Sequence, residues 1–454
     1  MPDADQNKHV VIVGAGSIGI SVAYYLARKH GRRRITLIDQ GQPMAFTSAQ
    51  SGENYRNWWP HPAMVDFTNR SIDLLEEIAR ETANRINMTR RGYVLATRRE
   101  DITPLIAQLH DGLQDQAAPL LRFHETAPAP TYRPFESSAW QDAPDGVDIL
   151  QNPALICRHF PQFDPAIRAI IHIRRGGDIS GQQLGAVMLD WLRAAGSKRI
   201  TGNVADITGN GPYTLSLGNG GDRIQADQIV NAAGPFAAQI AAMMGVELPL
   251  YNTFQQKIAF EDTAGAIPRT APFSIDLDEQ VIDWGDGQTL MAADPDLAWL
   301  TQKMPGAIHC RPDGGDAGRW IKLDWAYNQT RDTARRDVPL DDRFPEIVLR
   351  GAMRLNPALS AYLGRLPRAM HHYGGWYTMT DENWPLIGPM GPPESFMACA
   401  MSGFGTMAAC ASGELCADWI AHAPLPDYAE GFSMSRYQDT ELMKKLAVAN
   451  RGVL

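Results

Sequence analysis

The segment from His9 to Gly19, HVVIVGAGSIG, constrains the fold of this chain more than any other part of its sequence. Residues 10–13 form a short apolar run typical of a buried parallel strand, and an amphipathic helix is expected after the glycines. Gly14 would permit the tight turn, Gly16 would let the backbone approach a pyrophosphate, and Gly19 would let the helix pack closely on the strand. This spacing predicts a βαβ unit that binds a dinucleotide.

A carboxylate follows where such a unit needs one. Asp39 closes a second expected strand, residues 35–38, and stands about twenty residues past Gly19. There a carboxylate would bond the ribose diol of the cofactor and disfavour a 2′-phosphate, while the helix N-terminus would offer N–H groups to the phosphates. The unit therefore favours FAD or NAD and argues against NADP.

Composition excludes several classes of partner. The chain has 454 residues, enough for two or three domains, and its net charge of −9 gives no reason to expect nucleic acid or an anionic membrane surface. No run of roughly eighteen uncharged apolar residues is present, and the N-terminus is too polar for a secretion signal, so we expect a cytoplasmic protein. The cysteines lack metal-ligand spacing, which predicts free thiols and no metal site; they are Cys157, Cys310, Cys399, Cys410 and Cys416.

The nucleotide-binding signals recur far apart in the chain. A second strand, glycine turn and helix is expected over residues 396–420, although that pattern alone also fits a plain buried helix. Residues 111–150 are expected to form surface loops, and residues 248–370 a mostly antiparallel sheet. Further helices are expected at 64–79, 185–195 and 236–244, and strands at 92–97, 200–207, 213–217 and 319–325.

Four blocks of sequence carry a resemblance over nearly the whole chain. They are VVIVGAGSIGISVAYYLAR at 10–28, VNAAGPFAAQIAAMMGV at 230–246, GWYTMTDENWPLIGP at 375–389 and AMSGFGTMAACASGELCADWI at 400–420. In this order they resemble the D-amino-acid oxidase superfamily of flavoproteins, in particular the branch of sarcosine oxidase, glycine oxidase and the D-amino-acid dehydrogenases.

The resemblance implies an α/β fold of two domains. A discontinuous Rossmann-like FAD-binding domain would comprise residues 1–90, 151–247 and 371–454. A substrate domain built on an antiparallel sheet would comprise residues 91–150 and 248–370.

The resemblance also implies a set of FAD-binding residues. The pyrophosphate would lie at the first glycine turn, the adenosine ribose at Asp39, the adenine beside Val204, and the pyrimidine end of the flavin at the last glycine turn. Gly375 stands where sarcosine oxidase has the cysteine that bonds its flavin, so noncovalent FAD is expected. The implied residues are Gly14, Gly16, Ser17, Ile18, Gly19, Asp39, Gln40, Ser48, Ser51, Val204, Gly234, Gly403, Phe404, Gly405, Thr406 and Met407.

Two basic residues are the implied catalytic groups. Arg56 falls where sarcosine oxidase holds the substrate carboxylate, and a guanidinium could grip it through two parallel bonds. Lys322 aligns with a lysine that promotes the reaction of the flavin with dioxygen, because a fixed cation stabilises superoxide-like charge. The alternatives are a loop-supporting arginine and a surface lysine at a strand edge.

An aromatic wall is the remaining substrate feature. Met407 replaces the lysine that completes the carboxylate clamp in sarcosine oxidase, so the substrate need not be sarcosine. An aromatic wall for a larger or cationic amine could be formed by Trp58, Trp59 and Trp376 with Tyr55 and Tyr377, or these residues could be ordinary core.

The resemblance and Lys322 favour an FAD-dependent oxidase of a secondary amine or amino acid, with dioxygen as acceptor and hydrogen peroxide as product. The open alternatives are a dehydrogenase of D-amino acids or N-alkyl amino acids that passes electrons to a quinone or electron-transfer partner, and an enzyme of 2-hydroxy acids. A flavin subunit of a hetero-oligomer, or an assembly factor with structural FAD, is also open. Either a homo- or a hetero-oligomer is compatible with the sequence.

Overall fold

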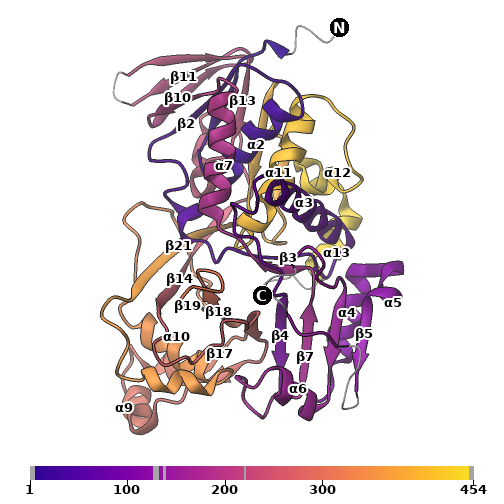
Figure 1. Ribbon diagram of the computed structural model, residues 1–454. Coiled ribbons are helices and arrows are strands. Elements are labelled where there is room, and N and C mark those ends of the chain that lie inside the picture. Colours follow the sequence, from indigo (N-terminus) through magenta and orange to yellow (C-terminus); the bar gives the residue numbers. More distant parts are fainter. Residues whose placement is uncertain (1–5, 126–131, 136–139, 219–220, 449–454) are drawn as a thin grey trace.

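The computed structural model describes residues 6–125, 132–135, 140–218 and 221–448. The chain forms two parts, each built on its own sheet (Figure 1). The indigo N-terminal segment and the yellow C-terminal segment lie together in the upper part of Figure 1. The structure thus has the two-part α/β architecture that the sequence predicts.

The upper part contains the predicted βαβ unit in a six-stranded sheet. Its strand order is β22-β23-β13-β1-β2-β9, and all neighbours are parallel except β22 and β23. The strands are β1 (Val10–Val13), β2 (Ile35–Asp39), β9 (Lys198–Thr201), β13 (Gln228–Asn231), β22 (Leu386–Pro389) and β23 (Ser395–Cys399).

The alternation of β1 side chains explains the layers on this sheet. Val10 and Ile12 join the core formed with the helices, whereas Val11 and Val13 join a second core on the opposite face. The helices are α2 (Ser17–Arg28), α3 (Pro62–Glu81), α7 (Gly181–Ala194) and α11 (Gly405–Ile420). The opposite face carries a meander of β10 (Val204–Gly209), β11 (Tyr213–Leu217) and β12 (Arg223–Ala226).

Glycine allows the two central helices to touch. A Cβ added to Gly413 of α11 would lie 2.5 Å from the backbone carbon of Ser21 in α2, which is closer than any side chain allows. The last long helix therefore packs directly on the first one.

The lower part is a ten-stranded, mostly antiparallel sheet. Its order is β20-β14-β19-β18-β15-β4-β7-β6-β5, with β21 paired to β14. The strands are β4 (Tyr93–Thr97), β5 (Leu121–His124), β6 (Val147–Leu150), β7 (Ala169–Ile173), β14 (Tyr251–Glu261), β15 (Phe273–Asp276), β18 (Ile308–Asp313), β19 (Trp320–Asp324), β20 (Arg331–Asp332) and β21 (His371–Met379).

Shorter elements surround these sheets. Two strand pairs are β3 (Asn54–Arg56) with β8 (Gly176–Asp178), and β16 (Gln280–Val281) with β17 (Lys303–Met304). The other α-helices are α4 (Thr103–Leu113), α5 (Ala117–Leu120), α6 (Pro153–His159), α8 (Ala237–Ala242), α9 (Gln288–Ala293), α10 (Phe344–Met353), α12 (Ala429–Phe432) and α13 (Thr440–Val448). Short 3₁₀ helices span Thr47–Gln50, Gln114–Gln116, Gly234–Phe236, Gly285–Gly287, Ala298–Thr301, Pro357–Tyr362 and Met434–Gln438.

The structure departs from the expected organisation in two places. Residues 111–150 are not only loop, because β5 and β6 form the parallel edge of the large sheet; residues 126–131 and 136–139 lie outside the described residues. Strands β7 and β21 pair within the large sheet, although their segments were expected in the FAD-binding domain. Sheet pairing is non-local, so the sequence of a single strand does not reveal its partners.

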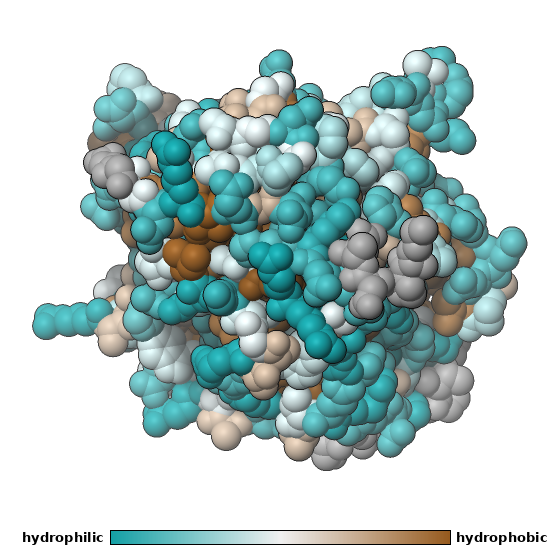
Figure 2. Space-filling model, turned by 90° about the horizontal axis from the view of Figure 1, so that it is seen from above, coloured by the Kyte–Doolittle hydropathy of each residue, from teal (hydrophilic) through white to brown (hydrophobic). Residues whose placement is uncertain are grey.

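Within the described ranges, no helix has both the length and the apolar character needed to cross a bilayer. The face in Figure 2 is mostly hydrophilic, with apolar side chains in small patches.

The lower sheet encloses an uncharged histidine. His172 Nε2 donates to the Arg91 carbonyl at 3.1 Å, and Nδ1 accepts from the Tyr132 hydroxyl at 3.1 Å. Burial, with help from the charge of Arg174, lowers the pKa of His172 to about 3. The neutral ring is therefore the form that the folded protein contains.

This histidine should make folding stability depend on pH. Because the unfolded ring has a pKa near 6.5, the unfolded state binds the extra proton between about pH 3 and 6.5, and stability falls as pH drops through that window. From about pH 7 to pH 5 the loss due to His172 is about 2 kcal/mol. Urea unfolding at pH 7 and pH 5 measures this loss of unfolding free energy, which should be smaller for His172→Gln than for the parent by about 2 kcal/mol. The control His110→Gln changes an exposed position and should behave like the parent. Equal pH dependence in all three proteins would contradict this assignment.

Candidate functional site

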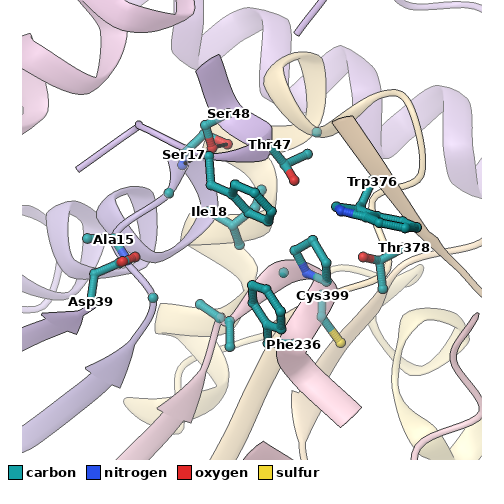
Figure 3. A pocket seen from close by; sticks show the side chains of 18 of the residues that line it. Ala15, Ser17, Ile18, Asp39, Thr47, Ser48, Phe236, Trp376, Thr378 and Cys399 are labelled. Carbon is teal, nitrogen blue, oxygen red and sulfur yellow. Dashed lines mark hydrogen bonds between the residues drawn. The ribbon is translucent and has the colours of Figure 1, made fainter. Parts of the chain in front are cut away.

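A cavity of about 560 Å³, here called the large cavity, opens at the carboxyl ends of β1, β2 and β13 (Figure 3). In open α/β sheets this edge is where ligands bind. The walls come from the turns after these strands, the segment from Met44 to Gly52, strand β21 and the turn between β23 and α11. The site thus draws on both ends of the chain.

The turn after β1 forms a close-fitting floor. Gly14 has a φ of +112°, and a Cβ there would lie 2.2 Å from the Ala232 carbonyl oxygen. A Cβ on Gly16 would lie 2.9 Å from Ser48 Oγ, which accepts a hydrogen bond from the Ser17 N–H at 3.0 Å. These contacts leave no room for a side chain at Gly14 or Gly16, and both glycines line the cavity at the start of α2, where a phosphate could approach the backbone.

Asp39 stands at the end of β2 with its carboxylate fixed. Oδ2 accepts from the Ala15 N–H and Oδ1 from the Gly41 N–H, both at 2.8 Å. Figure 3 shows Asp39 beside Ala15 at the cavity wall. Each carboxylate oxygen retains a lone pair, so the group can still accept from a ribose diol.

Another part of the cavity wall contains aromatic rings and a hydroxyl group without a hydrogen-bond partner in the part of the chain that the structure describes. Phe46 and Phe236 stack with centroids 5.7 Å apart, and Trp376 Nε1 donates to the Arg335 carbonyl at 3.0 Å. Thr47 Oγ1 is buried and has no hydrogen-bond partner among the described residues. Buried hydroxyls are normally satisfied, so this one suits a polar ligand in the cavity.

The turn between β23 and α11 closes the far end. Ala400 and Ser402 have φ values of +62° and +43°, in the left-handed region. A Cβ on Gly403 would lie 2.6 Å from the Tyr377 ring, and Thr406 Oγ1 donates to Ser51 Oγ at 2.7 Å. Such backbone conformations cluster where ligands bind.

These features fit FAD. The cavity is lined by turns from both halves of the sheet. It contains glycine backbone in the turn after β1, the fixed carboxylate of Asp39 and the hydroxyl of Thr47, which has no hydrogen-bond partner among the described residues. These are the groups that a dinucleotide's phosphates, ribose and polar ring edge require.

A second cavity of about 120 Å³, the small cavity, adjoins the first. Both are lined by Ser51, Gly52, Tyr377, Ser402, Gly403 and Thr406. The remaining walls include aromatic rings from three elements, namely Trp59, Tyr93 and Phe273. A small ligand here would lie next to whatever fills that end of the large cavity.

Arg56 lines the small cavity and is only 2% exposed. Its guanidinium lies over the rings of Trp59 and Tyr93, 4.6 and 4.8 Å from their centroids, and Nε donates to the Trp58 carbonyl at 3.1 Å. Cation–π contacts and this bond hold the charge in one orientation. The arrangement suits recognition of a carboxylate.

A buried ion pair lies between the two cavities. Lys257 lines the large cavity and Asp324 lines the small one, and their side chains are in contact. Lys257 Nζ also donates to the Tyr377 hydroxyl at 3.2 Å.

Both members of this pair are charged. Burial alone would raise the pKa of Asp324, but Lys257 and His309 outweigh it and lower that pKa to about 2. Burial would lower the pKa of Lys257, yet Asp324 raises it above its ordinary value.

Most of the predicted cofactor residues lie together. Those that line the large cavity are Gly14, Gly16, Ser17, Ile18, Asp39, Gln40, Ser48, Ser51, Val204, Gly234, Gly403, Gly405 and Thr406. Gly19 lies instead within α2, on the face packed against the preceding turn, where a Cβ would be 2.0 Å from the Gly14 carbonyl oxygen. Phe404 and Met407 line the small cavity.

The aromatic residues are distributed differently from the prediction. Tyr55 and Trp58 line neither cavity: the Tyr55 hydroxyl donates to the Thr89 carbonyl, and Trp58 is buried in the core. Trp376 lines the large cavity, while Trp59 lines the small one. The chain turns at this point, so neighbouring tryptophans face different surroundings.

Lys322 also lines neither cavity. Its Nζ donates to Glu53 Oε2 at 2.9 Å and lies 3.3 Å from Asp313. Lys257, on the adjacent strand, is the lysine that lines the large cavity.

Sequence reasoning missed Lys257, Asp324 and His309. A signal existed for one of them: Asp324 is two residues past Lys322, on the same face of its strand. Their mutual contact depends on strand register, which the sequence does not show.

Comparison with known proteins identifies the family of the chain. The family model described as DAO, FAD dependent oxidoreductase, matches residues 9–419. Human mitochondrial dimethylglycine dehydrogenase is 21% identical over 426 residues, which is 92% of this chain but only 43% of that protein. The chain therefore spans less than half of that relative.

Solved structures show the same fold. The L-proline dehydrogenase from P. horikoshii has a TM-score of 0.70 at 17% identity, covering 95% of this chain and 98% of that one. Glycine oxidase from Geobacillus kaustophilus has a TM-score of 0.68 at 17% identity, covering 95% and 99%. The predicted family and cofactor are confirmed: the chain belongs to the DAO family of FAD-dependent oxidoreductases.

Proposed function

We propose that the protein is an oxidase of an amino acid or a secondary amine that carries a carboxylate. The observation that carries this proposal is Arg56, a buried cation held between aromatic rings in a small cavity that adjoins the cofactor cavity. When bound, FAD supplies the redox chemistry by accepting two electrons from the substrate and passing them to dioxygen, which yields hydrogen peroxide.

The protein's own contribution is binding and orientation. Arg56 fixes the carboxylate through parallel hydrogen bonds, and the rings of Trp59 and Tyr93 exclude water on either side. The oxidised C–N bond is thereby held at the border of the two cavities, lined by Tyr377 and Gly403.

Lys257 supports an oxidase rather than a dehydrogenase. It is a fixed, buried cation that lines the cofactor cavity, and such a charge stabilises superoxide-like charge as dioxygen is reduced. A dehydrogenase that gives its electrons to a quinone or a protein partner is the second candidate, favoured by the similarity to dimethylglycine dehydrogenase.

We also propose that FAD is held noncovalently. Gly375 offers no thiol, and burial raises the pKa of Cys399, which lines the cavity, to about 12. The thiolate that a cysteinyl link from Cys399 would require is therefore absent at neutral pH.

The purified protein should be bleached anaerobically by a carboxylate-bearing amine and should recover its yellow colour on exposure to air. The panel comprises D-amino acids, N-methyl amino acids, uncharged amines and 2-hydroxy acids, followed by absorbance and a peroxide assay. Bleaching with slow recovery in air would instead favour the dehydrogenase. Bleaching only by 2-hydroxy acids would overturn amine oxidation.

Lys257→Met should slow reoxidation by dioxygen on the order of 100-fold, because one fixed charge facing the developing anion is lost. Anaerobic reduction by substrate should change much less. Lys322→Met is the matched control, since Lys322 lines neither cavity, and its reoxidation rate should stay near that of the parent. Stopped-flow measurement of both half-reactions checks this. If Lys322→Met slowed reoxidation more than Lys257→Met, Lys322 would be the residue that promotes the reaction with dioxygen.

Arg56→Ala should weaken binding of a carboxylate inhibitor roughly 10- to 100-fold, the loss expected for a hydrogen-bonded charge. Binding of an uncharged amine should be affected far less. Arg56→Lys should give an intermediate loss, because an ammonium keeps the charge but cannot form two parallel hydrogen bonds to a carboxylate. Titrations of flavin absorbance supply the affinities. Parallel losses for charged and uncharged ligands would show that Arg56 supports the loop instead.

A further inference from the structure

Three ionisable side chains form one row across adjacent strands between the two cavities. Lys257 of β14 pairs in register with Asp324 of β19, which pairs in register with His309 of β18. Lys257 lines the large cavity, while Asp324 and His309 line the small cavity. The row therefore reaches from the cofactor site to the proposed substrate site.

Asp324 has an unused acceptor. Its Oδ2 contacts Lys257 and lies 3.2 Å from His309 Nε2, but Oδ1 is buried without a hydrogen-bond partner among the described residues. The residue is only 3% exposed, and it lines the small cavity. A buried carboxylate oxygen without a donor is unfavourable, so this position suits a donor that a ligand brings.

His309 faces acceptors on both sides of its ring. Nδ1 lies 3.0 Å from the Ala307 carbonyl oxygen, and Nε2 lies 3.2 Å from the Asp324 carboxylate. Ala307 and Asp324 are both acceptors toward the ring, and His309 supplies no donor to Asp324 Oδ1.

Arg56 lies at the other side of the same cavity. Aromatic rings connect the two sides: Arg56 lies over Tyr93, Tyr93 packs on Phe273 with centroids 4.4 Å apart, and Phe273 packs on His309 at 4.8 Å. The cavity thus has a carboxylate-binding side and a hydrogen-bond-accepting side, separated by an apolar floor.

We propose that Asp324 is the amine-recognition residue of this cavity, and that the substrate is an amino acid whose reacting nitrogen keeps an N–H in its uncharged form. This rests on the proposed function. Arg56 favours the carboxylate. Because the C=N bond forms from the nitrogen lone pair, the substrate reacts as the uncharged amine, and the ammonium proton leaves to solvent. The remaining N–H donates to Asp324.

The same contact assists oxidation. As the C–H bond breaks and its electron pair leaves with the hydrogen to FAD, the C=N bond forms and positive charge develops on nitrogen. The carboxylate of Asp324 stabilises that charge in a site that excludes water. A tertiary amine has no N–H in its reactive form, so primary and N-monoalkyl amino acids are the substrate class that the site selects.

Two inert ligands test the recognition without turnover. Pyrrole-2-carboxylate and 2-furoate share a planar five-membered ring and a carboxylate, but only the pyrrole has an N–H. Titration of the holoenzyme, followed by flavin absorbance, should show the pyrrole binding roughly 10- to 100-fold more tightly, as expected for a hydrogen bond to a charged group. 1-Methylpyrrole-2-carboxylate should bind like 2-furoate.

Asp324→Asn should reduce that ratio several-fold or more. Because the variant leaves Lys257 buried without its counter-charge, the double variant Lys257→Met with Asp324→Leu removes both charges and should bring the ratio to about one. Asp313→Asn is the matched control: it neutralises an aspartate of the neighbouring strand that lines neither cavity, and the ratio should persist.

The outcomes separate the two proposals. The role of Asp324 is overturned if the parent protein binds the pyrrole and the furan equally. It is also overturned if the ratio of the two affinities is unchanged in both Asp324 variants. In either case, bleaching of the flavin by amines would still support the proposed function. If neither ligand alters the flavin spectrum and no amine bleaches it, the proposed function fails and the recognition of an amine fails with it.

Discussion

The contact between Gly14 and the Ala232 carbonyl is the constraint on which the rest of the site depends. It brings the turns after β1 and β13 together at one edge of the sheet, where no side chain could fit between them. Ser48 then caps the start of α2, and Ser51, three residues later, accepts from Thr406 at the start of α11. One short segment thus links α2 to α11 and forms a wall of both cavities.

The second requirement is a set of buried ionisable side chains that the structure holds at fixed positions. Strand register places Lys257, Asp324 and His309 in one row, and packing places Arg56 between two rings. Buried charges are costly unless they are paired, so each is tied to a partner or an aromatic face. The cofactor cavity is accordingly built mainly from backbone and small side chains, whereas the proposed substrate cavity is built from charged and aromatic ones.

Local sequence predicted the parts of the site that local structure forms. The strand, glycine turn and helix at residues 10–28 depend on neighbours in the chain, and Asp39 follows from the length of that unit. The position of Lys322 relative to Lys257 depends on how β19 pairs with β14, and the different surroundings of Trp58 and Trp59 depend on a turn. The parallel pair β5 and β6 was missed for the same reason, since each strand is short and finds its partner far away.

The packing of Gly413 against Ser21 has a consequence for biosynthesis. The first strand and helix leave the ribosome early, but the sheet that buries them needs β13 and β23, and the helix that covers α2 is α11, residues 405–420. Most of the chain must therefore be synthesised before the N-terminal unit can bury its apolar faces. During that interval those faces lack their covering, and the cofactor cavity cannot be completed before the turn at residues 400–406 has been synthesised.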